Sequence, residues 1–100
     1  NVVRRDLGEE VMQDITTYTK MSIEYALKSP KEALEFAKAW GRGIDDETNE
    51  EFVGMYVNNR TIDYKEDGRA AIRLFIKEGQ HIGMIRNDFN TATMRFIGEP

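Results

Sequence analysis

The chain has 100 residues and a formal net charge of −4 at pH 7, with 14 basic and 18 acidic residues mixed along the sequence. Because there is no block of basic residues, a surface for nucleic acid or for an anionic membrane is not expected. The absence of cysteine excludes disulfides, zinc–thiolate centres and thiol nucleophiles. No apolar run approaches the ~20 residues that a membrane-spanning helix needs. The length fits one small domain or a part of a larger one.

The N-terminal residues Asn1–Val3 are typical of a strand, and a first helix is predicted from about Leu7 to Lys28. Asp6 and Glu9 have the spacing of a capping box, in which each side chain satisfies a free amide of the other. The apolar residues form a wide stripe, which indicates more than one neighbour for this helix. The stripe comprises Leu7, Val11, Met12, Ile15, Tyr18, Thr19, Ser22, Ile23, Tyr25 and Leu27.

A second helix is predicted from Pro30 to about Trp40, ended by Gly41 and Gly43. Ser29 and Glu32 again have the spacing of a capping box. The residues expected to be buried are Ala33, Leu34, Phe36, Ala37 and Trp40.

A third helix is expected to start at Asp45 or Asp46 and to end near Asn58. Asn58 and Asn59 suit the left-handed conformation that often closes a helix. The apolar residues of this helix are Phe52, Val53, Tyr56 and Val57.

A fourth helix is predicted to follow Asp63, which would cap it together with Glu66. Replacing Asp63 by alanine would then lower the free energy of unfolding by about 1 kcal/mol. Gly79 is expected to weaken the helix by about 1 kcal/mol relative to alanine, and Gly83 is the preferred stop. The inward-facing residues are expected to be Ala71, Ile72, Phe75, Ile76, Ile82 and either Met84 or Ile85.

Residues 86–100 show no periodicity. Met94–Ile97 suits a short strand, and a mobile arm suits the segment equally well. We therefore expect a mainly α fold in which about four helices pack as a small bundle over residues 1–85, followed by a C-terminal tail over residues 86–100.

His81 is the only histidine, and without cysteine or a second histidine a catalytic pair or metal cluster would need carboxylates alone. A helix-end or surface role is expected. The residues Asp45, Asp46, Glu47, Glu50 and Glu51 form an acidic cluster. They lack the ligand spacing of an EF-hand and instead suit the positive end of a helix dipole.

Arg4 and Arg5 are predicted to pair with the acidic start of the first helix, although an anion site is the alternative. Gly41-Arg42-Gly43 is too short for a phosphate-binding loop. Trp40, Phe52 and Phe75 are expected in the core, where truncation to alanine would cost about 3–5 kcal/mol. The same core role is expected for Tyr18, Tyr25, Phe36 and Tyr56.

Several short segments occur in an order that resembles a known family. They are Val3-Arg4-Arg5-Asp6-Leu7-Gly8, Ser22-Ile23-Glu24-Tyr25-Ala26-Leu27, Glu32-Ala33-Leu34, Tyr56-Val57-Asn58, Ile62-Asp63 and Glu66-Asp67-Gly68-Arg69-Ala70-Ala71. Together, over residues 2–85, they resemble the C-terminal third of the menaquinone-biosynthesis enzymes of the futalosine route. The nearest branch is the 1,4-dihydroxy-6-naphthoate synthases, with the chorismate dehydratases as the sister branch.

The resemblance implies a two-lobed α/β fold similar to periplasmic solute-binding proteins, with the ligand cleft between the lobes. It implies a lyase-type reaction on a futalosine-derived or chorismate-like carboxylate, no metal or organic cofactor, and a cytoplasmic enzyme. The catalytic histidine of the synthases lies upstream, in the other lobe. His81 therefore does not inherit its role, and no catalytic, cofactor-binding or metal-binding residue is assigned in this chain. The implied partner is the N-terminal remainder of the polypeptide, with a homodimer also possible.

The chain departs from the synthase pattern at two places. Trp40-Gly41-Arg42-Gly43 stands where the pattern has His-Ala-Gln-Glu, and Lys65 stands where it has glycine. These departures leave the branch and the exact activity open.

Two hypotheses follow. The chain is either a scaffold part of an enzyme, inactive alone, or a stand-alone helical interaction or dimerisation module. An apolar patch larger than a few hundred Å², exposed or buried by self-association, would favour the first.

Overall fold

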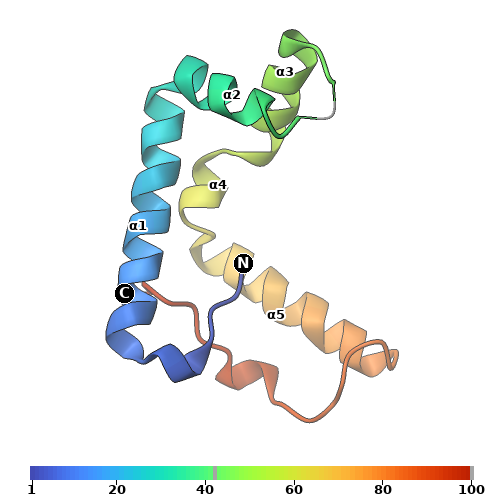
Figure 1. Cartoon of the computed structure of the whole chain (residues 1–100). Helices are drawn as coiled ribbons and strands as arrows, with labels where there is room; N and C mark the ends of the chain where they lie inside the picture. The colour runs from blue at the N-terminus through green and yellow to red at the C-terminus, as the bar shows by residue number, and fades with distance from the viewer. Residues whose placement is uncertain (42, 100) are drawn as a thin grey trace. The chain divides into compact units, whose positions relative to one another are not determined.

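The computed structural model describes residues 1–41 and 43–99, and within these ranges it contains helices and no strand (Figure 1). The prediction of a mainly α fold is confirmed, with five α-helices rather than about four. The elements are η1 (Arg5–Leu7), α1 (Glu9–Lys28), α2 (Pro30–Lys38), α3 (Asp46–Tyr56), α4 (Asn59–Ile62), α5 (Lys65–His81) and η2 (Thr91–Thr93), where η marks a 3-10 helix. The chain divides into two compact units, Asn1–Asp63 and Tyr64–Pro100.

The chain starts differently from its prediction. Residues 1–4 form no strand, and a 3-10 turn precedes α1, which begins at Glu9 after Gly8 in a positive-φ conformation. No side chain caps α1. Asp6 lies inside the 3-10 turn, where its carboxylate accepts a hydrogen bond from Arg4 Nε at 2.9 Å. The capping box of Asp6 and Glu9 is therefore wrong, because a charge-assisted partner two residues away takes the capping carboxylate.

The junction of α1 and α2 is held by a different contact from the one predicted. Pro30 begins α2 as expected, but the side chain of Ser29 makes no cap hydrogen bond. The Glu32 carboxylate instead accepts a hydrogen bond of 2.8 Å from the Tyr25 hydroxyl, which raises the pKa of Tyr25 above its ordinary value. This contact joins the last turns of α1 to the start of α2. The second helix ends at Lys38, two residues earlier than predicted.

The start of α3 confirms its prediction, whereas its end corrects one. Asp45 caps the helix, because its carboxylate accepts from the Thr48 amide at 2.9 Å and from the Thr48 hydroxyl at 2.8 Å. The helix ends at Tyr56, and Asn58 has extended rather than left-handed backbone. Asn58 caps the short helix α4, which the pattern did not predict, in a capping box with Thr61. Asparagine is favourable at both ends of helices, so its presence alone does not tell a stop from a start.

The last helix begins later than predicted and ends where predicted. Tyr64, not Asp63, occupies the N-cap position of α5. Lys65, the first residue of α5, has a φ of 60°. Gly83, with a φ of 77°, follows the helix, and the Met84 amide donates to the Gly79 carbonyl at 2.9 Å. The left-handed glycine thus lets the chain reverse over the last turn of α5.

Ile85 is the residue that packs back on α5. A Cβ atom built on Gly79 would lie 2.6 Å from Ile85 Cδ1 and 2.9 Å from Ile85 Cγ1. Gly79 was expected only to weaken the helix. The structure shows a positive reason for glycine here, because its missing side chain makes room for Ile85.

The segment after Ile85 lies against α5. Met94–Ile97 does not form the strand that was proposed. The 3-10 helix η2, which precedes these residues, contacts α5, and Arg73 Nη2 of α5 donates a hydrogen bond of 3.2 Å to the Met94 carbonyl. The two segments can be followed side by side in Figure 1.

The predicted apolar core is mostly absent. Among the described residues only Met12 and Gln80 are buried. Trp40, Phe52 and Phe75, which were expected in the core, are exposed by 78%, 53% and 76% of their surface, so that expectation is wrong for the chain by itself. The other predicted core residues that are exposed are Leu7, Val11, Ile15, Tyr18, Tyr25, Leu27, Phe36, Tyr56 and Ile82.

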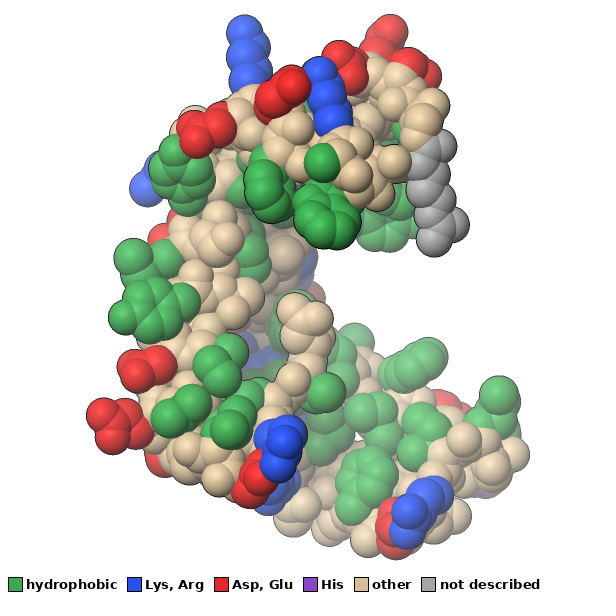
Figure 2. All heavy atoms as spheres, viewed as in Figure 1, with side chains coloured by type: hydrophobic (Ala, Val, Ile, Leu, Met, Phe, Trp, Pro, Cys, Tyr) green, Lys and Arg blue, Asp and Glu red, His purple; other side chains and the backbone are tan. Residues whose placement is uncertain are grey.

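The exposed apolar side chains have a simple cause. In the first unit, α1 contacts only η1, α2 and α4 to any extent. A helix with a wide apolar stripe needs several neighbours to cover it, and too few are present. Figure 2 shows hydrophobic side chains at the surface both over α2 and over α5.

The contact of Gly79 with Ile85 gives a double-mutant test. Gly79→Ala should gain about 1 kcal/mol of helix propensity in an Ile85→Ala background, but less in the parent chain, where the new methyl group meets Ile85. Chemical denaturation of the four variants measures this coupling. Gly54→Ala in α3 is the control, since a Cβ there meets nothing within 4 Å. Equal effects of Gly79→Ala in both backgrounds would contradict the assigned contact.

The backbone of Lys65 gives a second test. A side chain at positive φ costs about 1–2 kcal/mol that glycine avoids, and glycine is the residue of the synthase pattern at this position. Lys65→Gly should therefore be more stable than Lys65→Ala by about 1 kcal/mol. Comparing these two variants isolates the backbone effect, since both lose the lysine side chain. Equal melting temperatures would refute the strain at this residue.

Candidate functional site

The residues that the sequence suggested as candidates for catalysis or binding lie in different elements of the structure. His81 lies in the last turn of α5 and is exposed, which confirms the prediction of a helix-end histidine. No group of three or more His, Cys, Asp or Glu residues that could hold a metal ion occurs within residues 1–41 and 43–99.

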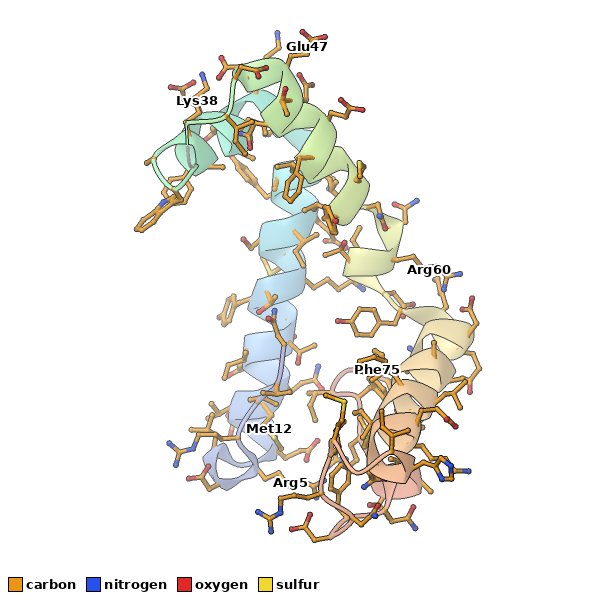
Figure 3. All side chains as sticks on the ribbon, turned by 90° about the vertical axis from the view of Figure 1, so that its right-hand side faces the viewer. Arg5, Met12, Lys38, Glu47, Arg60 and Phe75 are labelled. Carbon is orange, nitrogen blue, oxygen red and sulfur yellow. The ribbon has the colours of Figure 1, made fainter. Side chains whose placement is uncertain are left out.

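The acidic cluster at the start of α3 has structural partners. Lys38 Nζ, from the end of α2, forms ion pairs with Glu35 at 2.9 Å and with Asp46 at 3.0 Å. Hydrogen bonds to Glu35 and Asp46 raise the pKa of Lys38. In Figure 3, Lys38 and Glu47 project from neighbouring helix ends. The ion pair of Lys38 with Asp46 thus links the end of α2 to the start of α3.

The basic and glycine motifs also have local roles. Arg4 forms its ion pair with Asp6 of η1, and both side chains are exposed. Arg4 therefore forms a salt bridge, as predicted, but its partner precedes α1 and does not lie in the first turn of that helix. Gly41 donates its amide to the Ala37 carbonyl at 3.1 Å, as at a helix end, whereas Arg42 lies outside the described residues.

The first unit contains a mainly apolar cavity of about 150 Å³. It lies between the end of α1, α2 and α3 and is lined by Ala26, Leu27, Pro30, Ala33, Leu34, Ala37, Glu50, Val53, Gly54 and Val57. Only Glu50 among these residues can ionise. The cavity can therefore hold an apolar group.

The second unit has a wider, open depression of about 510 Å³. Its lining is polar and comprises Lys77, Gln80, Asn87, Asp88, Phe89, Asn90 and Thr91. Gln80, which is 9% exposed, donates its amide hydrogens to the backbone carbonyls of Arg86 and Phe89. Its side chain is therefore used in holding the segment after α5.

The sequence argument missed three residues of α5 with long-range contacts: Arg69, Arg73 and Gln80. Arg69 Nε lies 2.7 Å from Glu99 Oε1, and Arg73 and Gln80 bind carbonyls further along the chain. Their spacing of four and seven residues places them on one helix face. That spacing is the signal that could have found them.

The cap of α3 predicts a pH dependence. The hydrogen bond from the Thr48 amide is the main cause that lowers the pKa of Asp45 from its ordinary value of 3.8. Because the folded-state pKa is depressed, the stabilisation is present above the unfolded-state value and is lost as the pH falls from about 4 through the folded-state value. Asp45→Ala should thus lower the melting temperature at pH 7, by an amount that shrinks toward pH 2.

Asp45→Asn is the matched control, since asparagine caps helices without titrating. Its melting temperature relative to Asp45→Ala should not depend on pH. A pH-independent difference between the parent chain and Asp45→Ala would contradict the role of the carboxylate.

Comparison with known proteins gives the chain its relatives. A family model described as menaquinone biosynthesis matches residues 1–81. A 1,4-dihydroxy-6-naphtoate synthase of Thermus thermophilus is 32% identical over 83 residues, which are 83% of this chain and 30% of that protein. A 1,4-dihydroxy-6-naphtoate synthase of Streptomyces coelicolor is 26% identical over 84 residues, 84% of this chain and 30% of that protein. No solved structure matches the chain significantly.

The chain therefore spans about 30% of the length of the curated relatives it matches. No helix among the described residues is both long and apolar enough to cross a membrane. The family model covers most of the chain, and it agrees with the resemblance seen in the ordered segments. The chain belongs to the menaquinone biosynthesis family.

Proposed function

We propose that this chain is the C-terminal helical part of a menaquinone biosynthesis enzyme and serves there as scaffold. The observation that carries the proposal is the family match over residues 1–81 together with the small share of each relative that the chain spans. The proposed reaction is of the lyase type, on a futalosine-derived or chorismate-like carboxylate, and follows the synthase named in the relatives. The catalytic residues would be supplied by the N-terminal remainder of the polypeptide.

The exposed helix faces support this proposal. Tyr18, Met21 and Tyr25 of α1 are each more than half exposed and are spaced by three and four residues, so they share one face. Phe36 in α2 and Trp40, two residues after the helix, are exposed by 75% and 78%. Soluble proteins rarely leave such faces in water. In the full polypeptide these faces would pack on a lobe of a two-lobed fold similar to periplasmic solute-binding proteins.

The chemistry of the described residues is consistent with a scaffold role. Within the described residues no group of three or more His, Cys, Asp or Glu side chains could hold a metal ion, and the cavity in the first unit is lined mainly by apolar residues. The proposal involves no metal or organic cofactor. The sister activity, that of chorismate dehydratase, would use the same scaffold. An assay with a futalosine-derived and with a chorismate-like substrate distinguishes the two activities.

A stand-alone helical interaction or dimerisation module is the second candidate. The same exposed faces favour it, because a second copy of the chain could cover them. The two functions differ in what buries Trp40: another segment of the polypeptide or another copy of the chain.

The test compares one substitution in two contexts. In the polypeptide extended by its upstream coding sequence, Trp40→Ala should cost about 3–5 kcal/mol, because the indole would be covered. In the 100-residue chain it should cost less than about 1 kcal/mol, as at other exposed sites. Denaturation of both pairs measures the difference. Met12→Ala is the control, since Met12 is already buried and its truncation should be costly in both contexts.

Activity and molecular mass complete the test. The extended polypeptide should convert a futalosine-derived or chorismate-like carboxylate, and the 100-residue chain should not. A stable dimer of the 100-residue chain that Trp40→Ala dissociates would instead support the interaction module. An absence of any upstream coding sequence in frame would refute the enzyme-scaffold proposal.

A further inference from the structure

One face of α5 holds the end of the chain through three side chains. Arg69, Arg73 and Gln80 are separated by four and seven residues, which brings them within a narrow sector of the helix. Each contacts a different part of the segment 86–99. Residues 86–99 therefore occupy this face of α5, and their contacts show which chemical groups the face binds.

Two of the three side chains, Gln80 and Arg73, donate hydrogen bonds to backbone carbonyls. Gln80 Nε2 donates to the Arg86 carbonyl at 2.9 Å and to the Phe89 carbonyl at 3.1 Å. Arg73 Nη2 donates to the Met94 carbonyl at 3.2 Å. Main-chain carbonyls are present in any peptide, so these contacts fix the course of a bound chain without selecting its sequence.

Selection comes from an aromatic ring. The Arg73 guanidinium lies over the Phe96 ring, 4.9 Å from its centroid. The Tyr64 ring meets Phe96 edge to face, with centroids 6.4 Å apart and an interplanar angle of 86°. A cation over one face and an aromatic edge beside it favour a ring at this position.

A carboxylate three residues later completes the recognition. Glu99 Oε1 lies 2.7 Å from Arg69 Nε, and the Arg69 side chain is only 14% exposed. Gly98, with a φ of 85°, and the hydrogen bond from the Glu99 amide to the Phe96 carbonyl at 3.3 Å form the turn between ring and carboxylate. A shielded guanidinium favours a charged partner over a neutral one.

We propose that this face of α5 is a binding site for an extended peptide that carries an aromatic residue followed, across a glycine turn, by a carboxylate. Residues 86–99 occupy it as an intramolecular ligand. They lie beyond the family match, which ends at residue 81. Arg69, Arg73 and Gln80 lie within the matched residues, but the binding proposal rests on their contacts with residues 86–99 and not on the scaffold role proposed above.

Hydrogen exchange in the full chain tests whether the segment is held as proposed. Arg69 pairs with Glu66 as well as with Glu99, and Glu99→Gln removes the nearer of the two carboxylates. The amides of Met94 and Glu99, which donate to backbone carbonyls, should then exchange at least ~tenfold faster, while those of α5 keep their protection. Asp88→Asn is the matched control, because it removes a carboxylate whose partner, Arg86, is exposed. Unchanged exchange in Glu99→Gln would overturn the proposal. Equal acceleration throughout α5 would also overturn it, since Glu99 would then be part of helix folding.

Binding in trans tests the site itself. A fluorescent peptide of residues 86–99 should bind the full chain that carries Phe96→Ala and Glu99→Gln, as measured by anisotropy. It should not bind the parent chain, whose own segment competes at an effective concentration on the order of millimolar. A peptide with the same two substitutions should bind at least ~tenfold more weakly, as should the parent peptide after Arg73→Ala in the chain. Absence of binding to the doubly substituted chain, or equal binding of the two peptides, would overturn the proposal.

Discussion

An amphipathic helix gains most of its stability from the apolar side chains that it buries against other elements. This constraint governs the whole chain, because its helices have wide apolar faces and few neighbours. Met12 is the only large apolar side chain that is buried among the described residues. The remaining apolar helix faces therefore need a covering surface that the described residues do not provide.

Local polar contacts determine where the helices begin and turn, because little apolar packing is present to do so. Asp45 with Thr48 and Asn58 with Thr61 satisfy free amides at two helix starts, and Tyr25 with Glu32 joins two helices at their common corner. These contacts span three to seven residues, so each is made within a single stretch of sequence. They set where helices begin and turn, whereas they add little to the enclosure of a core.

Periodicity and capping patterns predicted the positions of α1, α2, α3 and α5, because helix formation is read from neighbouring residues. They failed where two local partners compete: Asp6 binds Arg4 instead of a helix amide, and Glu32 binds Tyr25. The predicted core failed for another reason. Periodicity shows which face of a helix is apolar, but it does not show whether the same chain supplies the cover, as the exposure of Trp40 demonstrates. The family was accessible from short ordered segments, whereas the pairing of Arg69 with Glu99, thirty residues apart, leaves no periodic trace.

Gln80 places a restriction of another kind on the chain. An amide nitrogen has two hydrogens, and Gln80 gives one to the Arg86 carbonyl and the other to the Phe89 carbonyl. The two residues between these carbonyls contribute neither acceptor, so their identity can drift. An inserted or deleted residue would leave one carbonyl beyond reach of its donor. Selection on this stretch should therefore act on its length before it acts on its composition.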